Sequence, residues 1–247
     1  MAVRQSWVVA VVAVVGTTLA ALVGSPAGAP AQASEPATEV PTILVIGDSI
    51  TGRHFRQPET HGKGWHDYLA EATGASVMVS AEGGSGFVRR GLKCQGTTFR
   101  ERLDQVQIHA PDFVVVAGGS NDAYYCGPEG ELTYTPTRRL RRSVTIYLRR
   151  LVAITDQQGM PRDHIYVFMP WGPERAKERP RIRDLVRAHV ERAGANFVPV
   201  LLLPPEASYD GVHPTPTGSQ FLYDQFARRS DFLSRFPPPP EAVPPPL

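Results

Sequence analysis

The stretch VIGDSITG, Val45–Gly52, closes an apolar, β-branched run that begins at Thr42. Such a run is typical of a buried strand, and a glycine, an aspartate and Ser49 follow it directly. These three residue types suit turns and helix caps, so an ordinary strand-to-helix turn explains them. Alternatively, the end of the strand holds Ser49 at the carboxyl edge of a sheet as a nucleophile. The rest of the chain has to distinguish these interpretations.

Short apolar runs alternate with segments of helical periodicity along the chain. The runs are Thr42–Ile46, Ser76–Ser80, Phe113–Ala117, His164–Met169 and Asn196–Leu202. Helices are expected near Trp65–Thr73, Thr98–His109, Thr137–Gln157, Arg179–Arg192 and Thr217–Phe226. Continuous apolar strands separated by helices are typical of a parallel sheet that is covered on both faces. We therefore predict an α/β fold: a three-layer α/β/α sandwich with a central parallel sheet of about five strands.

Polar clusters follow three further runs of this predicted sheet. EGGSG, Glu82–Gly86, comes after the second run, and GGSND, Gly118–Asp122, comes after the third. DGVHP, Asp210–Pro214, follows the fifth run after a short loop. Ligands of open α/β sheets bind beyond the carboxyl ends of the strands. The four clusters should therefore converge on one edge, which favours a functional role for Ser49.

The residues in these clusters are suited to nucleophilic catalysis. A serine hydroxyl needs a base within hydrogen-bond reach, and His213 is the leading candidate for Ser49. Asp210 precedes this histidine by three residues, so its carboxylate can reach the same imidazole and stabilise the imidazolium. Pro214 favours an extended backbone at His213 and so restricts where the ring is presented. We predict Ser49, His213 and Asp210 as the catalytic residues.

Acyl transfer also requires hydrogen-bond donors for the developing oxyanion. The backbone N–H of Ser49 can supply one, and the side-chain amide of Asn121 can supply another. A glycine in EGGSG would add a third, because its backbone can approach closely and adopt unusual dihedral angles. Gly83, Gly84 and Gly86 are all possible, and we select Gly84 because it directly precedes a small polar residue.

The four blocks GDSIT, EGGSG, GGSND and DGVHP resemble, in order and spacing, those of the SGNH (GDSL-type) hydrolase family. The resemblance implies that Ser49 is the nucleophile, that Gly84 and Asn121 are oxyanion donors, and that Asp210 and His213 complete the triad. It further implies a flavodoxin-like α/β/α fold and ester hydrolysis through an acyl-enzyme, with no metal and no cofactor. The second block departs from the family pattern, which often has an asparagine before its glycine. The G-x-S-x-G elbow of the α/β-hydrolases does not occur in the chain.

The two ends of the chain differ in composition from its middle. Residues 1–33 combine a basic start, an apolar stretch and Ala31-Gln32-Ala33, the order of a secretory signal peptide. A retained membrane anchor is the alternative for this segment. Residues 237–247 are rich in proline, and we expect a disordered tail. Residues 35–236 then form one hydrolase domain.

Net charge is +2, and charged residues make up 20% of the chain, so no acidic partner is required. The densest basic run, Arg138–Arg150, has leucines and a valine at helical spacing, which favours a solvated helix face over a nucleic-acid site.

Cys94 and Cys126 are the two cysteines, and in an exported chain one disulfide is expected. His54, His61 and His66 fit no zinc pattern, so we interpret them as exposed loop histidines.

These observations predict an exported serine esterase, secreted or in the cell envelope, acting on a small-molecule, lipid or glycan ester. Acyl transfer and O-deacetylation of an envelope polysaccharide are alternatives that use the same site. A non-catalytic binding module of the same fold is a further alternative. We expect a monomer with no nucleic-acid partner and no membrane span after signal cleavage.

Overall fold

A parallel sheet organises the structure, a computed structural model that describes residues 39–52 and 62–237. Its strands are β1 (Thr42–Gly47), β2 (Ser76–Ala81), β3 (Phe113–Ala117), β6 (Ile165–Phe168) and β7 (Asn196–Val198). They lie in the order β2-β1-β3-β6-β7, and every neighbouring pair is parallel. The predicted five-stranded parallel sheet is confirmed.

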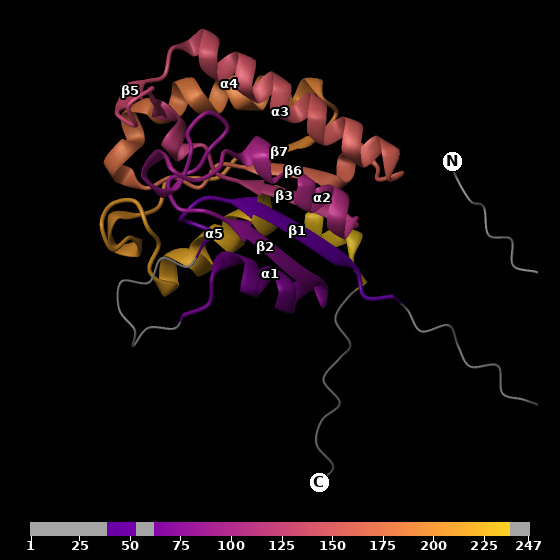
Figure 1. The fold of residues 1–247 in the computed structure, drawn as a ribbon. Helices are drawn as coiled ribbons and strands as arrows, with labels where there is room; N and C mark the ends of the chain where they lie inside the picture. The colour runs from indigo at the N-terminus through magenta and orange to yellow at the C-terminus, as the bar shows by residue number, and fades with distance from the viewer. Residues whose placement is uncertain (1–38, 53–61, 238–247) are drawn as a thin grey trace, which may run out of the picture. The chain divides into compact units, whose positions relative to one another are not determined.

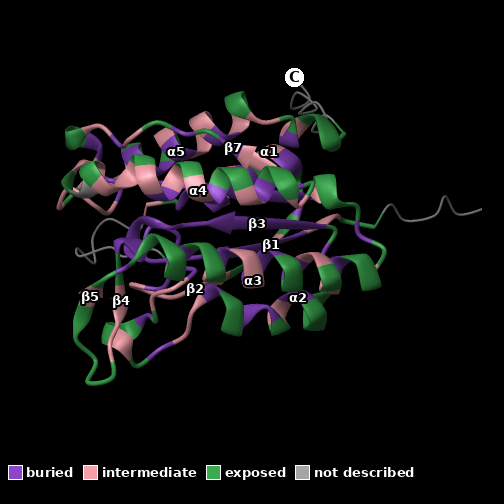
Figure 2. Ribbon diagram, turned by 90° about the horizontal axis from the view of Figure 1, so that it is seen from above, coloured by how far each residue is buried: buried purple, intermediate pink, exposed green. Residues whose placement is uncertain are grey.

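Helices cover both faces of this sheet (Figure 1). The α-helices are α1 (Trp65–Thr73), α2 (Asp104–His109), α3 (Thr137–Gln157), α4 (Arg179–Arg192) and α5 (Pro216–Arg229). Side chains of α2, α3 and α4 pack into one apolar cluster with one face of the strands, and side chains of α1 and α5 pack into a second with the other face. In Figure 2, β1 and β3 are buried, whereas exposed and buried residues alternate along α3. The predicted three-layer sandwich is therefore also confirmed.

The short elements lie in the connections between these strands and helices. The 3₁₀ helices are Leu92–Cys94, Phe99–Arg102, Ser120–Ala123, Arg162–His164, Pro173–Glu178, Pro205–Ala207 and Phe232–Arg235. A separate antiparallel hairpin consists of β4 (Tyr124–Cys126) and β5 (Leu132–Tyr134), and it follows directly after the third of these helices. Cys94 and Cys126 form a disulfide with a Cα–Cα distance of 5.6 Å, which joins this hairpin to the loop after β2.

Several expected elements differ in detail. The segment Thr98–His109 is not one helix: a 3₁₀ turn ends at Arg102, and α2 begins at Asp104. The last strand ends at Val198 and not at Leu202, because Pro199 follows it and has no N–H to donate to a ladder. The hairpin was not anticipated, since strands of three residues are too short to show a pattern.

The ends of the strands lie in register, and this register positions the site. Gly47 of β1 lies opposite Ala81 of β2 and Ala117 of β3. Ala117 in turn lies opposite Phe168 of β6. Three of the four polar clusters therefore leave the sheet at the same level, one from each of three adjacent strands.

Candidate active site

The turn after β1 holds Ser49. The backbone N–H groups of Thr51 and Gly52 both donate to the carbonyl of Asp48, at 3.1 and 2.9 Å, which closes the turn. A Cβ on Gly47 would lie only 2.4 Å from the Thr51 hydroxyl, so a glycine is needed where the strand ends. Ser49 is 8% exposed, so the residue lies in a largely buried turn.

A chain of two hydrogen bonds links Ser49 to Asp210 through His213. The Ser49 Oγ lies 2.9 Å from Nε2 of the imidazole, and Nδ1 of the same ring lies 2.8 Å from Asp210 Oδ2. The sequence separation of Ser49 and His213 is 164 residues, so the fold alone brings them together. The three predicted catalytic side chains thus meet with hydrogen-bond geometry throughout.

The loop that carries His213 is tightly hydrogen-bonded. Asp210 Oδ1 accepts the backbone N–H of Val212 at 3.1 Å and of His213 at 2.8 Å. The His213 carbonyl in turn accepts the Ser208 hydroxyl and the Tyr209 N–H, both at 2.9 Å. These contacts fix the backbone on both sides of the ring, so its position requires no contact with substrate.

Asp210 is a strong acid in this environment. Partial burial acts to raise its pKa, but hydrogen bonds from the His213 amide and imidazole outweigh burial and lower the pKa to about 2. The carboxylate is therefore ionised at every pH at which an esterase would be assayed. An ionised acceptor at Nδ1 favours the tautomer in which Nε2 accepts the proton of Ser49.

Asn121 connects the second and third polar clusters to this turn. Its side-chain amide donates to the Ser85 carbonyl at 3.0 Å and to Asp48 Oδ2 at 3.2 Å. Asp48 itself is fully buried and accepts the Ile50 N–H at 2.9 Å through its other oxygen. The carboxyl group of Asp48 therefore fixes both the nucleophile turn and the Asn121 amide.

Two buried carboxyl groups next to the site have raised pKa values. Burial raises the pKa of Asp48 to about 7, against the opposing hydrogen bond from Ile50. Burial also raises the pKa of Asp122 to about 6, against hydrogen bonds from three backbone amides. Each carboxyl group is protonated more readily than an exposed aspartate would be.

The second polar cluster is shaped around Asp122. The carboxylate accepts the N–H groups of Phe87, Val88 and Arg89 at 3.0, 2.7 and 3.2 Å. A Cβ on Gly86 would lie 2.4 Å from Asp122 Oδ1, so glycine is required for this close approach. The backbone amides of this loop therefore bind the carboxylate of Asp122.

Arg102 ties the ends of two strands to this loop. Its guanidinium donates to the carbonyls of Ser80 and Gly47 at 2.5 and 2.9 Å and to the Ser85 hydroxyl at 2.8 Å. Its side chain is buried, and burial lowers its pKa. Sequence reasoning missed Asp48, Asp122 and Arg102 as site-building residues. The position of both aspartates inside the recognised blocks was the available signal.

The glycines of the second cluster differ in what their backbone amides contact. The N–H of Gly86 donates to the Arg89 carbonyl at 3.0 Å and is thereby used. Within residues 39–52 and 62–237, the N–H groups of Ser49, Gly83 and Gly84 have no acceptor. Gly84 has a φ of +80°, a conformation that favours glycine. The role of the Gly84 N–H as an oxyanion donor therefore stays a prediction.

The histidines proposed as exposed require one correction. His66 is only 4% exposed: it lies in the first turn of α1, and its Nε2 contacts the Thr51 carbonyl at 3.2 Å. His54 and His61 lie outside the described residues. In the described part of the chain, no group of three or more His, Cys, Asp or Glu side chains is arranged to hold a metal ion.

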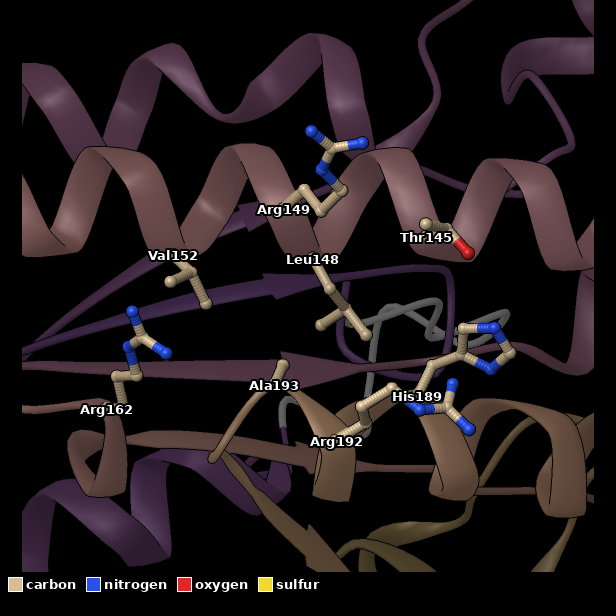
Figure 3. Close-up of a pocket in the computed structure, with 8 residues that line it drawn as sticks. All are labelled: Thr145, Leu148, Arg149, Val152, Arg162, His189, Arg192 and Ala193. Atoms are coloured by element: carbon tan, nitrogen blue, oxygen red, sulfur yellow. The ribbon is translucent and has the colours of Figure 1, made fainter.

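A separate apolar pocket of about 310 Å³ lies on the outer helical layer, between α3 and α4 (Figure 3). Leu148 and Val152 project into it from α3, opposite Ala193 and His189. None of its lining residues belongs to the four polar clusters. The pocket holds no arrangement of nucleophile and base, so the sheet edge remains the candidate active site.

The architecture is shared with solved esterases. A family two carbohydrate esterase from Clostridium thermocellum, in complex with cellohexaose, has a TM-score of 0.58 at 17% identity, covering 81% of this chain and 67% of its own. A carbohydrate acetylesterase family member from Sinorhizobium meliloti has a TM-score of 0.53 at 16% identity, and the match covers 78% of this chain and 99% of that chain. The M. smegmatis aryl esterase has a TM-score of 0.51 at 18% identity, and the match covers 78% of this chain and 100% of that chain. These three structures therefore share the α/β fold of this chain.

The sequence comparison identifies the family directly. The model of the GDSL-like lipase/acylhydrolase family matches residues 45–221, which include Ser49, Asn121, Asp210 and His213. The chain belongs to this family of ester hydrolases. A search of curated proteins finds no match.

Proposed function

We propose that this chain is a serine esterase that hydrolyses carboxylic esters through an acyl-enzyme. The observation that carries the proposal is the hydrogen-bonded chain Ser49–His213–Asp210, with heavy-atom distances of 2.9 and 2.8 Å. Membership of an ester hydrolase family supports the reaction class. A nucleophile with an adjacent base, oriented by a third group, is the arrangement that acyl transfer requires.

In the first half of the reaction, Ser49 Oγ bonds to the ester carbonyl carbon while His213 Nε2 takes its proton. The carbon–oxygen bond to the alcohol then breaks, and the imidazolium returns the proton to the leaving oxygen. In the second half, water attacks the acyl-enzyme with His213 again as base, which releases the acid and the free serine. Asp210 stays ionised throughout, because, despite partial burial, hydrogen bonds from His213 lower its pKa to about 2.

The tetrahedral intermediates carry a negative oxygen that needs donors. We assign this role to the Ser49 N–H, the Gly84 N–H and the Asn121 amide. Asn121 already donates to Asp48 Oδ2 at 3.2 Å and to Ser85 at 3.0 Å, so the oxyanion takes over one of these hydrogens. The longer bond to Asp48 is the one that we expect to be released.

Labelling with a fluorophosphonate tests the nucleophile. The wild-type chain should form a stoichiometric adduct at Ser49, detected by mass spectrometry of the intact protein and its peptides. Ser49→Ala should not react, and Ser120→Ala, which changes a buried serine on the neighbouring loop, should still react. A folded wild-type protein that resists the probe would show that Ser49 is not activated, and the esterase proposal would fail.

Deacetylation of a polysaccharide is a second candidate, favoured by the exposed aromatic side chains after Asn121. Tyr124 and Tyr134 are 40% and 49% exposed, and their rings contact each other with centroids 6.3 Å apart. The Arg181 guanidinium lies 4.8 Å from the centre of the Tyr134 ring, so the exposed ring of Tyr124 is the surface that would contact the apolar face of a sugar. Two of the structural neighbours are described as carbohydrate esterases. Acyl transfer to an acceptor other than water would use the same site.

We further propose that the protein acts outside the cytoplasm. The signal-like segment at residues 1–33 and the Cys94–Cys126 disulfide support export, since disulfides persist in oxidising compartments. Within residues 39–52 and 62–237, no helix has the length and apolar character that a bilayer span requires. Cell fractionation with an antibody against the chain tests the location, and a purely cytoplasmic pool would contradict it.

A further inference from the structure

An arginine-rich cavity lies beside the start of α3 and contains no acidic side chain. Its volume is about 640 Å³. We refer to it as the arginine cleft, and its lining residues are Arg100, Arg138, Arg139, Arg142, Tyr125, Pro136, Ser143 and Ile146. Four guanidinium groups thus surround one cavity without a carboxylate among them. Like charges repel at such short range, so the arrangement favours a bound anion.

Arg100 interacts electrostatically with Glu101, whereas Arg138, Arg139 and Arg142 have no ionic partner among the described residues. Within residues 39–52 and 62–237, no guanidinium of the arginine cleft forms a salt bridge or donates a hydrogen bond. Other arginines of the surface do have partners: Arg162 pairs with Asp156 at 2.8 Å, and Arg187 pairs with Glu191 at 2.7 Å. Among the described residues, Arg141, Arg149 and Arg192 likewise form no salt bridge, so the distinguishing feature of the cleft is that four arginines line one cavity.

The helix itself adds to the positive potential of the cleft. Helix α3 begins at Thr137, and Arg138, Arg139 and Arg142 lie in its first two turns, with no acidic residue in the first turn. The amino end of a helix carries partial positive charge, so cations at this position are unfavourable and an anion is favourable. A bound anion would reduce the repulsion between the partial positive charge of the helix end and the clustered arginines.

One arginine of the cleft is held in place before any ligand binds. The guanidinium carbon of Arg139 lies 3.7 Å from the centre of the Tyr125 ring. This cation–π contact restricts the side chain without neutralising its charge. The entropy lost on binding an anion is thereby reduced at this position.

The cleft adjoins the loops that carry the predicted oxyanion donors. A second cavity of about 230 Å³ shares Arg100 and Arg139 with it and continues to Phe87 and Val88. The amides of Phe87 and Val88 are held by Asp122, the neighbour of Asn121. Tyr125 follows Asn121 by four residues, so at about 3.4 Å per residue the two lie within about 14 Å. A ligand that reaches from Asn121 to Tyr125 therefore spans no more than this upper limit.

We propose that the arginine cleft binds a phosphate group on the alcohol part of the ester substrate, so that the enzyme prefers esters of phosphorylated sugars. Guanidinium groups bind phosphate oxygens in pairs, and four of them suit a dianion better than a single carboxylate. The cavity is larger than one phosphate and leaves room for part of the attached sugar. The binding site stands on the geometry of the cleft, whereas its role as a substrate subsite rests on the proposed esterase function.

Calorimetry with the full chain tests the binding site without requiring activity. Glucose 6-phosphate should bind saturably with one site per chain, and glucose should not bind. Arg138→Gln/Arg142→Gln should raise the Kd at least about tenfold, because two charge-assisted contacts are lost. The matched control is Arg149→Gln/Arg150→Gln, which removes two exposed charges of the same helix outside the cleft. The control should change the Kd less than about twofold.

Three outcomes would overturn the binding site. These are no saturable binding to wild type, equal weakening by both double variants, or binding unaffected by the cleft variant. Vesicles that contain phosphatidylglycerol provide a second binding measurement. Cleft-dependent binding to these vesicles, without binding to glucose 6-phosphate, would assign the phosphate to a lipid headgroup and overturn the sugar assignment.

Kinetics with a matched pair of esters test the role in substrate selection. Acetylated glucose 6-phosphate should have a kcat/KM at least about tenfold above that of acetylated glucose, and the cleft double variant should reduce this ratio towards one. Equal kcat/KM values in the wild type, alongside intact phosphate binding, would overturn the subsite role. Hydrolysis of neither ester, nor of nitrophenyl acetate, would instead contradict the proposed esterase function, and calorimetry would still decide the anion site.

Discussion

The buried carboxyl group of Asp48 predicts that the protein loses stability as pH rises through neutrality. Asp48 has an exposure of 0% and lies directly before the nucleophile turn, with Asp122 as a second buried acid nearby. Its pKa is raised from 3.8 to about 7, mainly by burial. The folded state therefore binds this proton more tightly than the unfolded state. By linkage, the free energy of unfolding falls as pH rises from about 4 to about 7 and then levels off.

The size of the effect follows from the pKa difference. At 1.36 kcal/mol for each pKa unit, a rise from 3.8 to about 7 corresponds to about 4 kcal/mol at full ionisation. About 3 kcal/mol of this falls between pH 5 and pH 8. Asp210 does not oppose the loss in this window, because its pKa of about 2 leaves it ionised at both pH values.

Urea unfolding at pH 5 and pH 8, followed by tryptophan fluorescence, measures the loss. Trp65 and Trp171 are fully buried and should report unfolding of the core. Asp48→Asn removes the titrating group while retaining an acceptor for the Ile50 amide, so the variant should lose about 3 kcal/mol less than wild type over the same range. Asp104→Asn, an exposed change, should behave as wild type. Equal pH dependence in wild type and Asp48→Asn would refute the raised pKa as the cause.

Three further outcomes follow from the site and its surroundings. Asn121→Ala should lower kcat by about 10²–10³ with little change in KM, as expected for a donor to the oxyanion, and an unchanged kcat would remove it from that role. Activity of wild type should fall towards acid pH, because a protonated His213 cannot accept the Ser49 proton, while Asp210, with a pKa of about 2, stays ionised. A flat profile between pH 5 and pH 8 would exclude His213 as the base. Reduction of the Cys94–Cys126 disulfide should lower stability by roughly 4 kcal/mol, since it closes a loop with a separation of 32 residues, and identical melting curves with and without reductant would contradict this.

Much of the architecture follows from periodicity alone. The helices α1, α3 and α4 begin and end at the residues expected from their apolar spacing, because each buries one stripe against the sheet. In α3, the predicted apolar positions Leu140, Val144, Leu148 and Leu151 are all buried, and the arginines between them are exposed. Where local pattern and burial agree, the sequence is sufficient to predict the element.

The broken helix after Thr98 and the short last strand show where pattern reasoning stops. Thr98 and Glu101 form a reciprocal cap that starts a 3₁₀ turn, and the α-helix begins only at Asp104. A local polar contact thus decides between two helical forms that share one apolar pattern. The hairpin of Tyr124–Cys126 and Leu132–Tyr134 has strands of only three residues, and the Cys94–Cys126 disulfide links it to a distant loop, a contact that local periodicity does not show.

For the candidate site, the sequence by itself determined which side chains follow the strand ends, and the rule for parallel sheets was sufficient to bring Ser49, Asn121 and His213 towards one edge. Tertiary structure alone decided that Asp48 and Asp122 are buried, and that four arginines surround one cavity. Burial and the distance between charges depend on residues far apart in the chain. The pKa values and the potential of the surface therefore emerge only when the layers pack together.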